Sequence, residues 1–214
     1  AWWDYGYQIN GVANRTTLAD GNTWNHEHIA LLGHCLTGEE RPSHEVIRHL
    51  ADYVLIWAGE GINDVAKSPH MARIANSVYH DVCPGDPLCK SYSMNRQTGE
   101  PSDRMRRTLL WKMYAHGLVD DVKVDPELFE EAYTSKHGLV RIFKVLKVSE
   151  ESKDWVSKPE NWNCDAPGSW HCQGQYPPAL GEVLRKQQVF KQLEDFNQEA
   201  DEKAKEYHKA YMER

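Results

Sequence analysis

Two stretches of the sequence carry the β-branched and apolar residues that are typical of strands, and both are short. Residues 53–59 read YVLIWAG, and residues 138–148 read GLVRIFKVLKV. Within the second stretch Arg141, Lys144 and Lys147 recur every three residues, which is a helical spacing, but the β-branched content favours a strand. The surrounding segments have helical patterns. We therefore expect a mixed α/β (α+β) fold that is helix-rich and surrounds a small β-sheet.

Helix signals divide the first half of the chain. A helix is expected to end at Thr37, before Gly38, and a second helix to cover about residues 43–51. Ser68 suits the N-cap of a third helix, because Pro69 then falls at the first helical position, where its missing N–H costs nothing.

Two further helices are expected in the middle of the chain. Ser102 or Asp103 is expected to begin a helix that ends near Gly117. Asp125, which is followed by proline and glutamate, predicts a short capped helix over residues 125–135, DPELFEEAYTS.

The whole chain of 214 residues is expected to form one domain. Its core is expected at about residues 1–148. An irregular loop follows at 149–178, where Trp, Pro, Gly and Cys are frequent, and a long polar C-terminal helix at 179–214.

Four of the five cysteines bracket short loops. Cys83 and Cys89 enclose CPGDPLC, and Cys164 and Cys172 enclose CDAPGSWHC. Neither pair has the Cys-x-x-Cys spacing of a zinc knuckle, so we predict two local disulfides and an oxidising compartment. The alternative is five free thiols in a cytosolic protein. Cys35 lies in a helical run and is expected to be a buried free thiol.

Charge and hydropathy exclude some classes of function. The net charge is −7, which argues against a nucleic-acid partner, because such proteins usually present a basic surface. No stretch approaches the roughly 18 apolar residues that a membrane-spanning helix needs. The chain begins AWWDYGY, and two tryptophans rarely stand at the frayed tip of a folded domain. We therefore expect the chain to be part of a longer protein.

The opening tryptophans and aspartate can together bind a single hydroxyl group. An ionised carboxylate such as that of Asp4 only accepts hydrogen bonds, and the indole N–H groups of Trp2 and Trp3 only donate. A Ser or Thr hydroxyl has one proton to donate and lone pairs to accept with, so it matches this set. Without further context, an aromatic core cluster beside a surface aspartate is the more frequent explanation.

The stretch WWDYGYQI resembles the signature of the catalytic subunit of oligosaccharyltransferase, which transfers a lipid-linked oligosaccharide to asparagine. The similarity covers residues 1 to about 148, and it is greatest to the single-subunit enzymes of some protists, where residues 167–179 extend it. The family also carries the pattern Asp-x-x-Lys-x-x-x-Met, which Asp64, Lys67 and Met71 match here. Because Pro69 lies within the pattern, Asp64 and Lys67 are expected in a turn that precedes the helix holding Met71.

The resemblance implies a role for each of these residues. Trp2, Trp3 and Asp4 would bind the hydroxyl of the Ser or Thr two residues after the acceptor asparagine, in the sequence Asn-x-Ser/Thr. Met71 would contact the threonine methyl group, and Tyr7 would contact the first sugar of the donor. The supporting motif residues are Tyr5, Gly6, Asp64 and Lys67.

The resemblance also implies an enzyme in the membrane of the endoplasmic reticulum, with this domain in the lumen. Its partners would be an acceptor polypeptide, a dolichyl-pyrophosphate oligosaccharide and the protein's own transmembrane region. The family's Mn²⁺ or Mg²⁺ ligands lie in loops outside this chain, so no metal is expected here. The domain alone is therefore expected to be inactive.

Two other interpretations and one modification signal remain open. His26, His28 and His34 could form a metal site, although a zinc-peptidase helix needs His-Glu-x-x-His, and Ala30 stands at the second histidine position. The chain could also be a non-catalytic lumenal module that binds peptides or partner subunits. Asn14 begins an Asn-Arg-Thr acceptor sequence, which we expect to be too buried for use.

Overall fold

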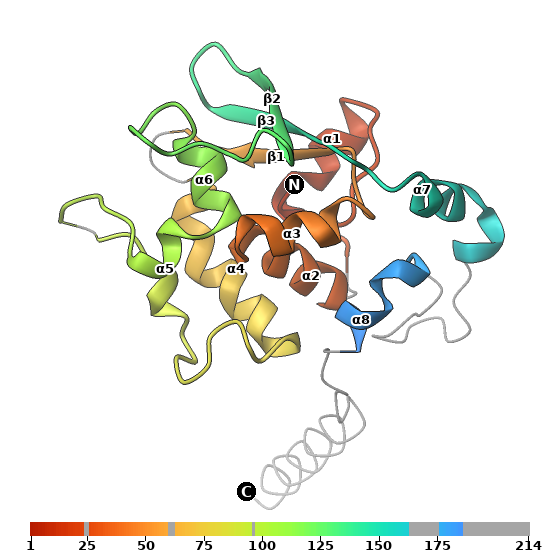
Figure 1. Cartoon of the computed structure of the whole chain (residues 1–214), viewed down its shortest axis with the longest axis horizontal. Coiled ribbons are helices and arrows are strands. Elements are labelled where there is room, and N and C mark those ends of the chain that lie inside the picture. Colours follow the sequence, from red (N-terminus) through yellow and green to blue (C-terminus); the bar gives the residue numbers. More distant parts are fainter. Residues whose placement is uncertain (24–25, 60–62, 96, 163–175, 186–214) are drawn as a thin grey trace, which may run out of the picture.

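A three-stranded antiparallel sheet lies over a group of helices (Figure 1). The computed structural model describes residues 1–23, 26–59, 63–95, 97–162 and 176–185. The sheet has the order β1–β3–β2, with β1 at Tyr53–Trp57, β2 at Phe129–Thr134 and β3 at Val140–Val145. The expected mixed α/β fold and both expected strands are confirmed.

Helices of very different length make up most of the rest of the described fold. The α-helices are α1 Gly6–Gly11, α2 His26–Thr37, α3 Glu40–Ile47, α4 Asp64–Val78, α5 Asp103–Arg106, α6 Leu109–Ala115, α7 Glu150–Ser157 and α8 Gly181–Leu184. Short 3₁₀ turns lie at η1 Trp3–Tyr5, η2 Lys90–Tyr92, η3 Pro159–Trp162 and η5 Pro178–Leu180. None of the described helices is long and apolar enough to cross a membrane.

The centre of the fold is the packing of α2 against α4. A Cβ atom at Gly33 of α2 would lie 2.5 Å from the carbonyl oxygen of Met71 in α4, so only glycine allows this close approach. The sheet adds Ile56 and Phe143 to the same apolar core, and both are fully buried. This packing fixes the first turns of α4 relative to the amino-terminal segment.

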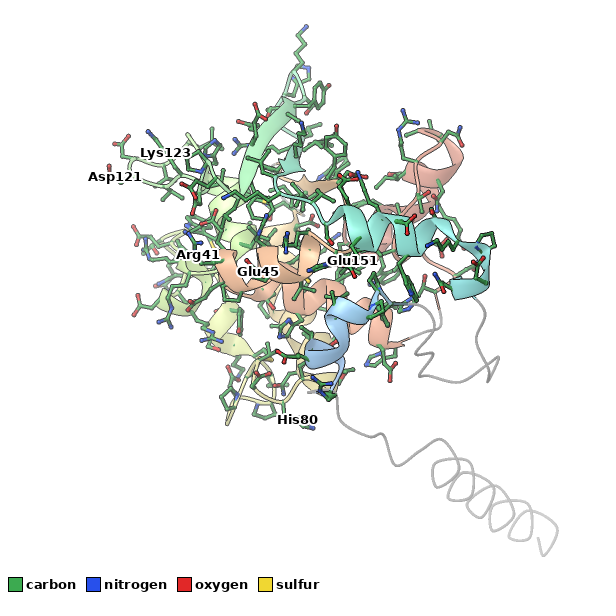
Figure 2. All side chains as sticks on the ribbon, turned by 45° about the vertical axis from the view of Figure 1, so that its right-hand side comes forward. Arg41, Glu45, His80, Asp121, Lys123 and Glu151 are labelled. Atoms are coloured by element: carbon green, nitrogen blue, oxygen red, sulfur yellow. A yellow bond between two sulfur atoms is a disulfide. The ribbon has the colours of Figure 1, made fainter. Side chains whose placement is uncertain are left out.

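Helix α3 illustrates how the sequence pattern selects the buried face. Val46 and Ile47 are buried in the core, whereas Arg41 and Glu45 extend from the outer face of the helix (Figure 2). The helix was expected from about residue 43, and it begins earlier, at Glu40. The carboxylate of Glu40 is bound by the Lys112 ammonium at 2.5 Å, which anchors this first turn to α6.

The structure corrects the expected start of α4. The helix begins at Asp64, and Asn63 is its N-cap through a side-chain bond from the Ala66 amide at 2.9 Å. Pro69 therefore lies inside the helix, and it removes the backbone hydrogen bond that residue 69 would donate to Val65. The cap at Asn63 and the packing on α2 outweigh this loss.

Residues 125–135 do not form the expected helix. Asp125 does accept a hydrogen bond from the Glu127 amide at 2.9 Å, but this cap closes only a turn. Strand β2 follows, because its residues pair with β3 from Phe129 onward. The cap signal at Asp125 was therefore correct, but pairing with the next strand makes the following residues a strand and not a helix.

Strand β1 was expected to be buried, and it is an edge strand instead. Val54 and Ile56 face the core, whereas Tyr53 is 54% exposed. The segment expected as one helix up to Gly117 is divided into α5 and α6, each with its own cap. Ser102 caps α5 as expected, and Thr108 caps α6 through the Trp111 amide.

The expectations for loops and cysteines have mixed outcomes. The Cys83–Cys89 disulfide is confirmed, and Cys35 is a buried free thiol as expected. Part of the region expected to be irregular is ordered as α7 and η3. The second predicted disulfide, Cys164–Cys172, and the predicted C-terminal helix beyond residue 185 lie outside the described residues.

Candidate functional site

The amino-terminal tryptophans lie beside each other at the start of α4. Trp2 is 1% exposed and Trp3 is partly buried, and their ring centroids are 6.4 Å apart. The indole nitrogen of Trp3 is buried and has no hydrogen-bond partner among the described residues. A buried donor of this kind is costly, about 1–3 kcal/mol, unless a ligand supplies the acceptor.

A chain of short polar contacts joins the two sequence motifs. The Lys67 ammonium donates to Asp4 Oδ2 at 2.5 Å and to the Tyr5 hydroxyl at 2.9 Å. Tyr5 donates in turn to Asp64 Oδ1 at 2.6 Å. Residues about 60 positions apart in sequence therefore meet in one network, as the combined motifs predict.

Asp64 is the buried centre of this network. It is 0% exposed, and it accepts hydrogen bonds from the Tyr5 hydroxyl and from the Trp57 amide at 2.8 Å. Burial raises the pKa of Asp64 above its ordinary value of 3.8, although these hydrogen bonds act in the opposite direction. Burial also raises the pKa of the Tyr5 phenol, and the hydrogen bond to Asp64 adds to this effect. Tyr5 is therefore a hydrogen-bond donor here.

Gly6 is required by a close approach of the chain. A Cβ atom at this position would lie 2.4 Å from the Ala19 carbonyl oxygen and 2.4 Å from the Cβ of Asp20. Any other residue would push residues 19–20 away from α1. The Tyr5 ring stacks on Trp57 with centroids 5.9 Å apart, which fixes the turn that precedes Gly6.

Two of the predicted site residues lie apart from the network. Met71 is fully buried in the core between α4 and its neighbours, so its side chain presents no surface to a ligand in this structure. Tyr7 is 51% exposed, and its ring lies over Gly21. The structure thus brings together Trp2, Trp3, Asp4, Tyr5, Asp64 and Lys67, and it leaves Met71 and Tyr7 outside this group.

His70 belongs to the same surface and was not predicted. Its ring meets Trp2 edge to face at 6.4 Å, and its Nδ1 bonds Arg73 Nη2 at 3.0 Å. The spacing of three residues from Lys67 to His70 to Arg73 could have indicated it, because such residues share one side of a helix.

The other histidines make separate contacts. His26 shares a hydrogen bond with the Ser77 hydroxyl at 2.6 Å, and the ring of His28 lies against Tyr176. His34 lies against Tyr79. Within the described residues, no group of three histidine, cysteine or carboxylate side chains is placed to hold a metal ion.

The Asn-Arg-Thr sequence differs from its expectation. Asn14, Arg15 and Thr16 are all exposed, and Asn14 has a left-handed backbone with φ of 51°. The segment after α1 is therefore a surface turn, because a left-handed residue reverses the chain direction there.

Comparison with known proteins identifies relatives of this chain. Residues 1–76 match the STT3/PglB/AglB core domain. The dolichyl-diphosphooligosaccharide–protein glycosyltransferase subunit STT3 of Saccharomyces cerevisiae is 34% identical over 170 residues, which cover 69% of this chain and 24% of the yeast protein.

Two further relatives give the same result. The corresponding subunit stt3 of Schizosaccharomyces pombe is 35% identical over 176 residues, covering 72% of this chain and 23% of that protein. Subunit stt-3 of Caenorhabditis elegans is 36% identical over 179 residues, covering 69% of this chain and 23% of that protein. The chain thus spans about a quarter of the length of these relatives.

Proposed function

Because the chain belongs to the STT3/PglB/AglB family through its core domain at residues 1–76, we propose that it recognises acceptor polypeptides in an oligosaccharyltransferase catalytic subunit. In this proposal it binds the Ser or Thr of Asn-x-Ser/Thr while a lipid-linked oligosaccharide is transferred to the asparagine. The names of the relatives support the activity, and the geometry of the amino-terminal motif supports the role of this part.

The observation that carries the proposal is the unpartnered indole of Trp3, the residue that directly precedes Asp4, whose carboxylate is held by Lys67. A hydroxyl group placed between them accepts from the indole N–H and donates to the carboxylate. Asp4 keeps acceptor capacity for this, because a carboxylate offers about four lone-pair sites and Lys67 contacts only Oδ2.

The remaining polar residues of the network position Asp4. Lys67 holds the carboxylate of Asp4, and Tyr5 and Asp64 hold Lys67 in turn. Fixing these groups before a ligand arrives lowers the entropy lost on binding. An acceptor without the hydroxyl leaves Trp3 unpaired and Asp4 short of a donor, at about 1–3 kcal/mol for each group.

The chemistry of transfer lies mainly outside this chain. The asparagine nitrogen attacks the anomeric carbon of the sugar, and the dolichyl pyrophosphate leaves. A bound Mn²⁺ or Mg²⁺ neutralises charge on the leaving group in such a reaction. In this proposal, as the family resemblance implies, the ligands of that ion belong to another part of the longer protein, within the membrane of the endoplasmic reticulum.

Two assignments complete the proposal. Tyr7, exposed at the surface, is placed against the donor sugar, and Met71 would reach the threonine methyl only if the wall of α4 shifts on binding, because it is buried here. This domain alone would not transfer a glycan.

The test is a transfer assay on the full-length protein, comparing wild type with Asp4→Ala. Acceptor peptides carry Asn-x-Thr, Asn-x-Ser or Asn-x-Ala. We expect transfer to the first two peptides to fall about 100-fold, because hydrogen bonds to a charged group contribute up to about 3 kcal/mol. Asp120→Ala, at an exposed loop position, is the control. Unchanged rates and unchanged threonine preference in Asp4→Ala would refute the proposal.

A further inference from the structure

One side of α4 carries a row of basic side chains beside the site. Lys67, His70 and Arg73 follow each other at intervals of three residues, so they lie along one side of the helix. Lys67 contacts Asp4, the ring of His70 contacts Trp2, and Arg73 bonds His70. The row therefore leads from the candidate site along the surface of α4.

The two charged ends of this row differ in their partners. The ammonium of Lys67 lies between the carboxylates of Asp4 and Asp64. The guanidinium of Arg73 is exposed, and no carboxylate of the described residues lies within ion-pair distance of it. The chain as a whole carries a net charge of −7 and repels anions. An arginine without an acidic partner can therefore bind an anionic group at this one place.

His70 orients this guanidinium. Its Nδ1 accepts from Arg73 Nη2, so its neutral ring carries its proton on Nε2. Burial lowers the pKa of His70, and the positive charge of Arg73 lowers it further, so the imidazole is neutral near pH 7. The positive charge of the pair thus resides on Arg73, and the edge contact with Trp2 fixes the ring that holds it.

Helix geometry gives the distance from the site to this charge. Arg73 follows Lys67 by six residues, which is a rise of about 9 Å along the axis and about a third of a turn around it. An extended polypeptide covers about 3.3 Å per residue. A peptide whose hydroxyl is bound at Asp4 therefore reaches the side chain of Arg73 within about four residues.

We propose that Arg73, positioned by His70, selects an acidic side chain within about four residues after the Ser or Thr of the acceptor sequence. This inference rests on the proposed function. In the proposed function the acceptor asparagine extends toward catalytic groups outside the described residues. The residues that follow the Ser or Thr of the acceptor then lie above the surface of α4. A glutamate there forms a charge-assisted hydrogen bond with the guanidinium.

The experiment measures transfer by the full-length protein to three peptides. Each contains Asn-x-Thr, and the third residue after threonine is Glu, Gln or Lys. Wild type is expected to prefer Glu over Gln about fivefold in kcat/KM, the scale of a partly exposed ion pair. The preference should disappear in Arg73→Gln, reverse toward Lys in Arg73→Glu, survive in Arg73→Lys and shrink with added salt.

A matched control and two outcomes make the test decisive. Arg107→Gln removes an exposed arginine on a different element and should keep the preference for Glu. If Arg73→Gln keeps that preference, or lowers transfer to all three peptides equally, the inference is wrong; the second result would assign Arg73 to donor binding or folding.

The same assay separates this inference from the proposed function. If wild type transfers equally to Asn-x-Ala and Asn-x-Thr peptides, the proposed function fails, whatever Arg73 does. If that discrimination is present and Glu is not preferred over Gln, the inference about Arg73 alone fails.

Discussion

Two ionic clusters in this molecule, each with one buried charged residue (Arg141 and Asp64), differ in how completely their hydrogen bonds are used. Around Arg141 the guanidinium bonds Glu131 Oε1 through Nε and Nη2, and it also bonds the carbonyl oxygens of Tyr114 and His116. Around Asp4 and Lys67 the network is equally short, yet the adjacent indole N–H of Trp3 has no partner among the described residues.

The difference distinguishes a structural cluster from the candidate binding site. Arg141 is 4% exposed, and its bonds fasten the end of α6 to the sheet, so it leaves little to offer a ligand. The amino-terminal cluster is organised just as firmly but keeps one donor and the outer lone pairs of Asp4 open. A buried donor without a partner requires an explanation, and at the candidate site a ligand hydroxyl would supply one.

The largest effect is expected from Arg141→Ala. Removing the guanidinium takes the cationic partner from Glu131 and a donor from two carbonyl groups, and breaking a buried pair in this way costs about 3–5 kcal/mol. Urea unfolding of the purified chain measures the loss, with Arg107→Ala as an exposed control. A loss below about 1 kcal/mol would show that the cluster is not what holds α6 to the sheet.

Trp3→Phe is expected to change recognition and leave stability almost unaltered. It removes a donor that has no partner in the unliganded protein, and this gain offsets the packing lost with the smaller ring, so the free energy of unfolding should fall by less than about 1 kcal/mol. Transfer to Asn-x-Thr peptides by the full-length protein should fall about tenfold, the scale of one lost hydrogen bond. Equal losses of stability and transfer would instead make Trp3 a core residue.

The Cys83–Cys89 disulfide tests whether the far end of α4 matters to the site. Its loop closes over a sequence separation of six, so the double change Cys83→Ser with Cys89→Ser should cost about 2 kcal/mol. We expect thermal unfolding to shift downward while discrimination between Asn-x-Thr and Asn-x-Ala stays the same. A loss of discrimination would couple the disulfide to the network at the start of the helix.

The smallest expected effect is a difference in pH dependence between the two clusters. Burial acts to raise the pKa of Glu131, but hydrogen bonds from Thr134 and Arg141 outweigh it and hold the pKa below its ordinary value of 4.5. Its stabilising contribution is present above pH 4.5 and is lost as the pH falls through the folded pKa. Asp64, whose folded pKa is raised above 3.8, behaves in the opposite sense and is favoured by acid.

Stability measured against pH in Glu131→Gln and Asp64→Asn checks these signs. As the pH falls below about 4.5, the advantage of wild type over Glu131→Gln should shrink. Over the range above 3.8, wild type should gain relative to Asp64→Asn as the pH falls. Parallel curves for the two variants would contradict the distinction.

The sequence predicted which residues lie together at the candidate site more accurately than it predicted the helices and strands that hold them. The joint occurrence of WWDYG with Asp64 and Lys67 predicted one shared site, and the structure does bring these residues together. The motifs were recognised through their joint resemblance to the oligosaccharyltransferase family, because each of them alone is more often an aromatic core cluster or a solvated ion pair. Pro69 led to a wrong helix start, since the gain from the Asn63 cap and from tertiary packing cannot be read locally.

Other features depend on contacts that are distant in sequence. Strand β2 was taken for a helix because Asp125 carries a true cap signal, whereas the strand state follows from pairing with β3, the next strand along the chain. The missing partner of Trp3 is likewise a property of the assembled fold. Arg141 was visible only as one of three evenly spaced cations, and its carbonyl partners lie 25 and 27 residues away.

The hydrogen bond from the Trp57 amide to Asp64 has a consequence for solubility. Strand β1 is at the edge of the sheet, and its outward N–H groups are the ones that a foreign strand would bind. The carboxylate of Asp64 occupies one of them, so a single side chain stands where a neighbouring strand would be. Loss of the Asp64 side chain would therefore expose an unpaired N–H group at the edge of the sheet and would also weaken the network with Tyr5 and Lys67. We expect such a variant to self-associate in addition to losing the proposed recognition.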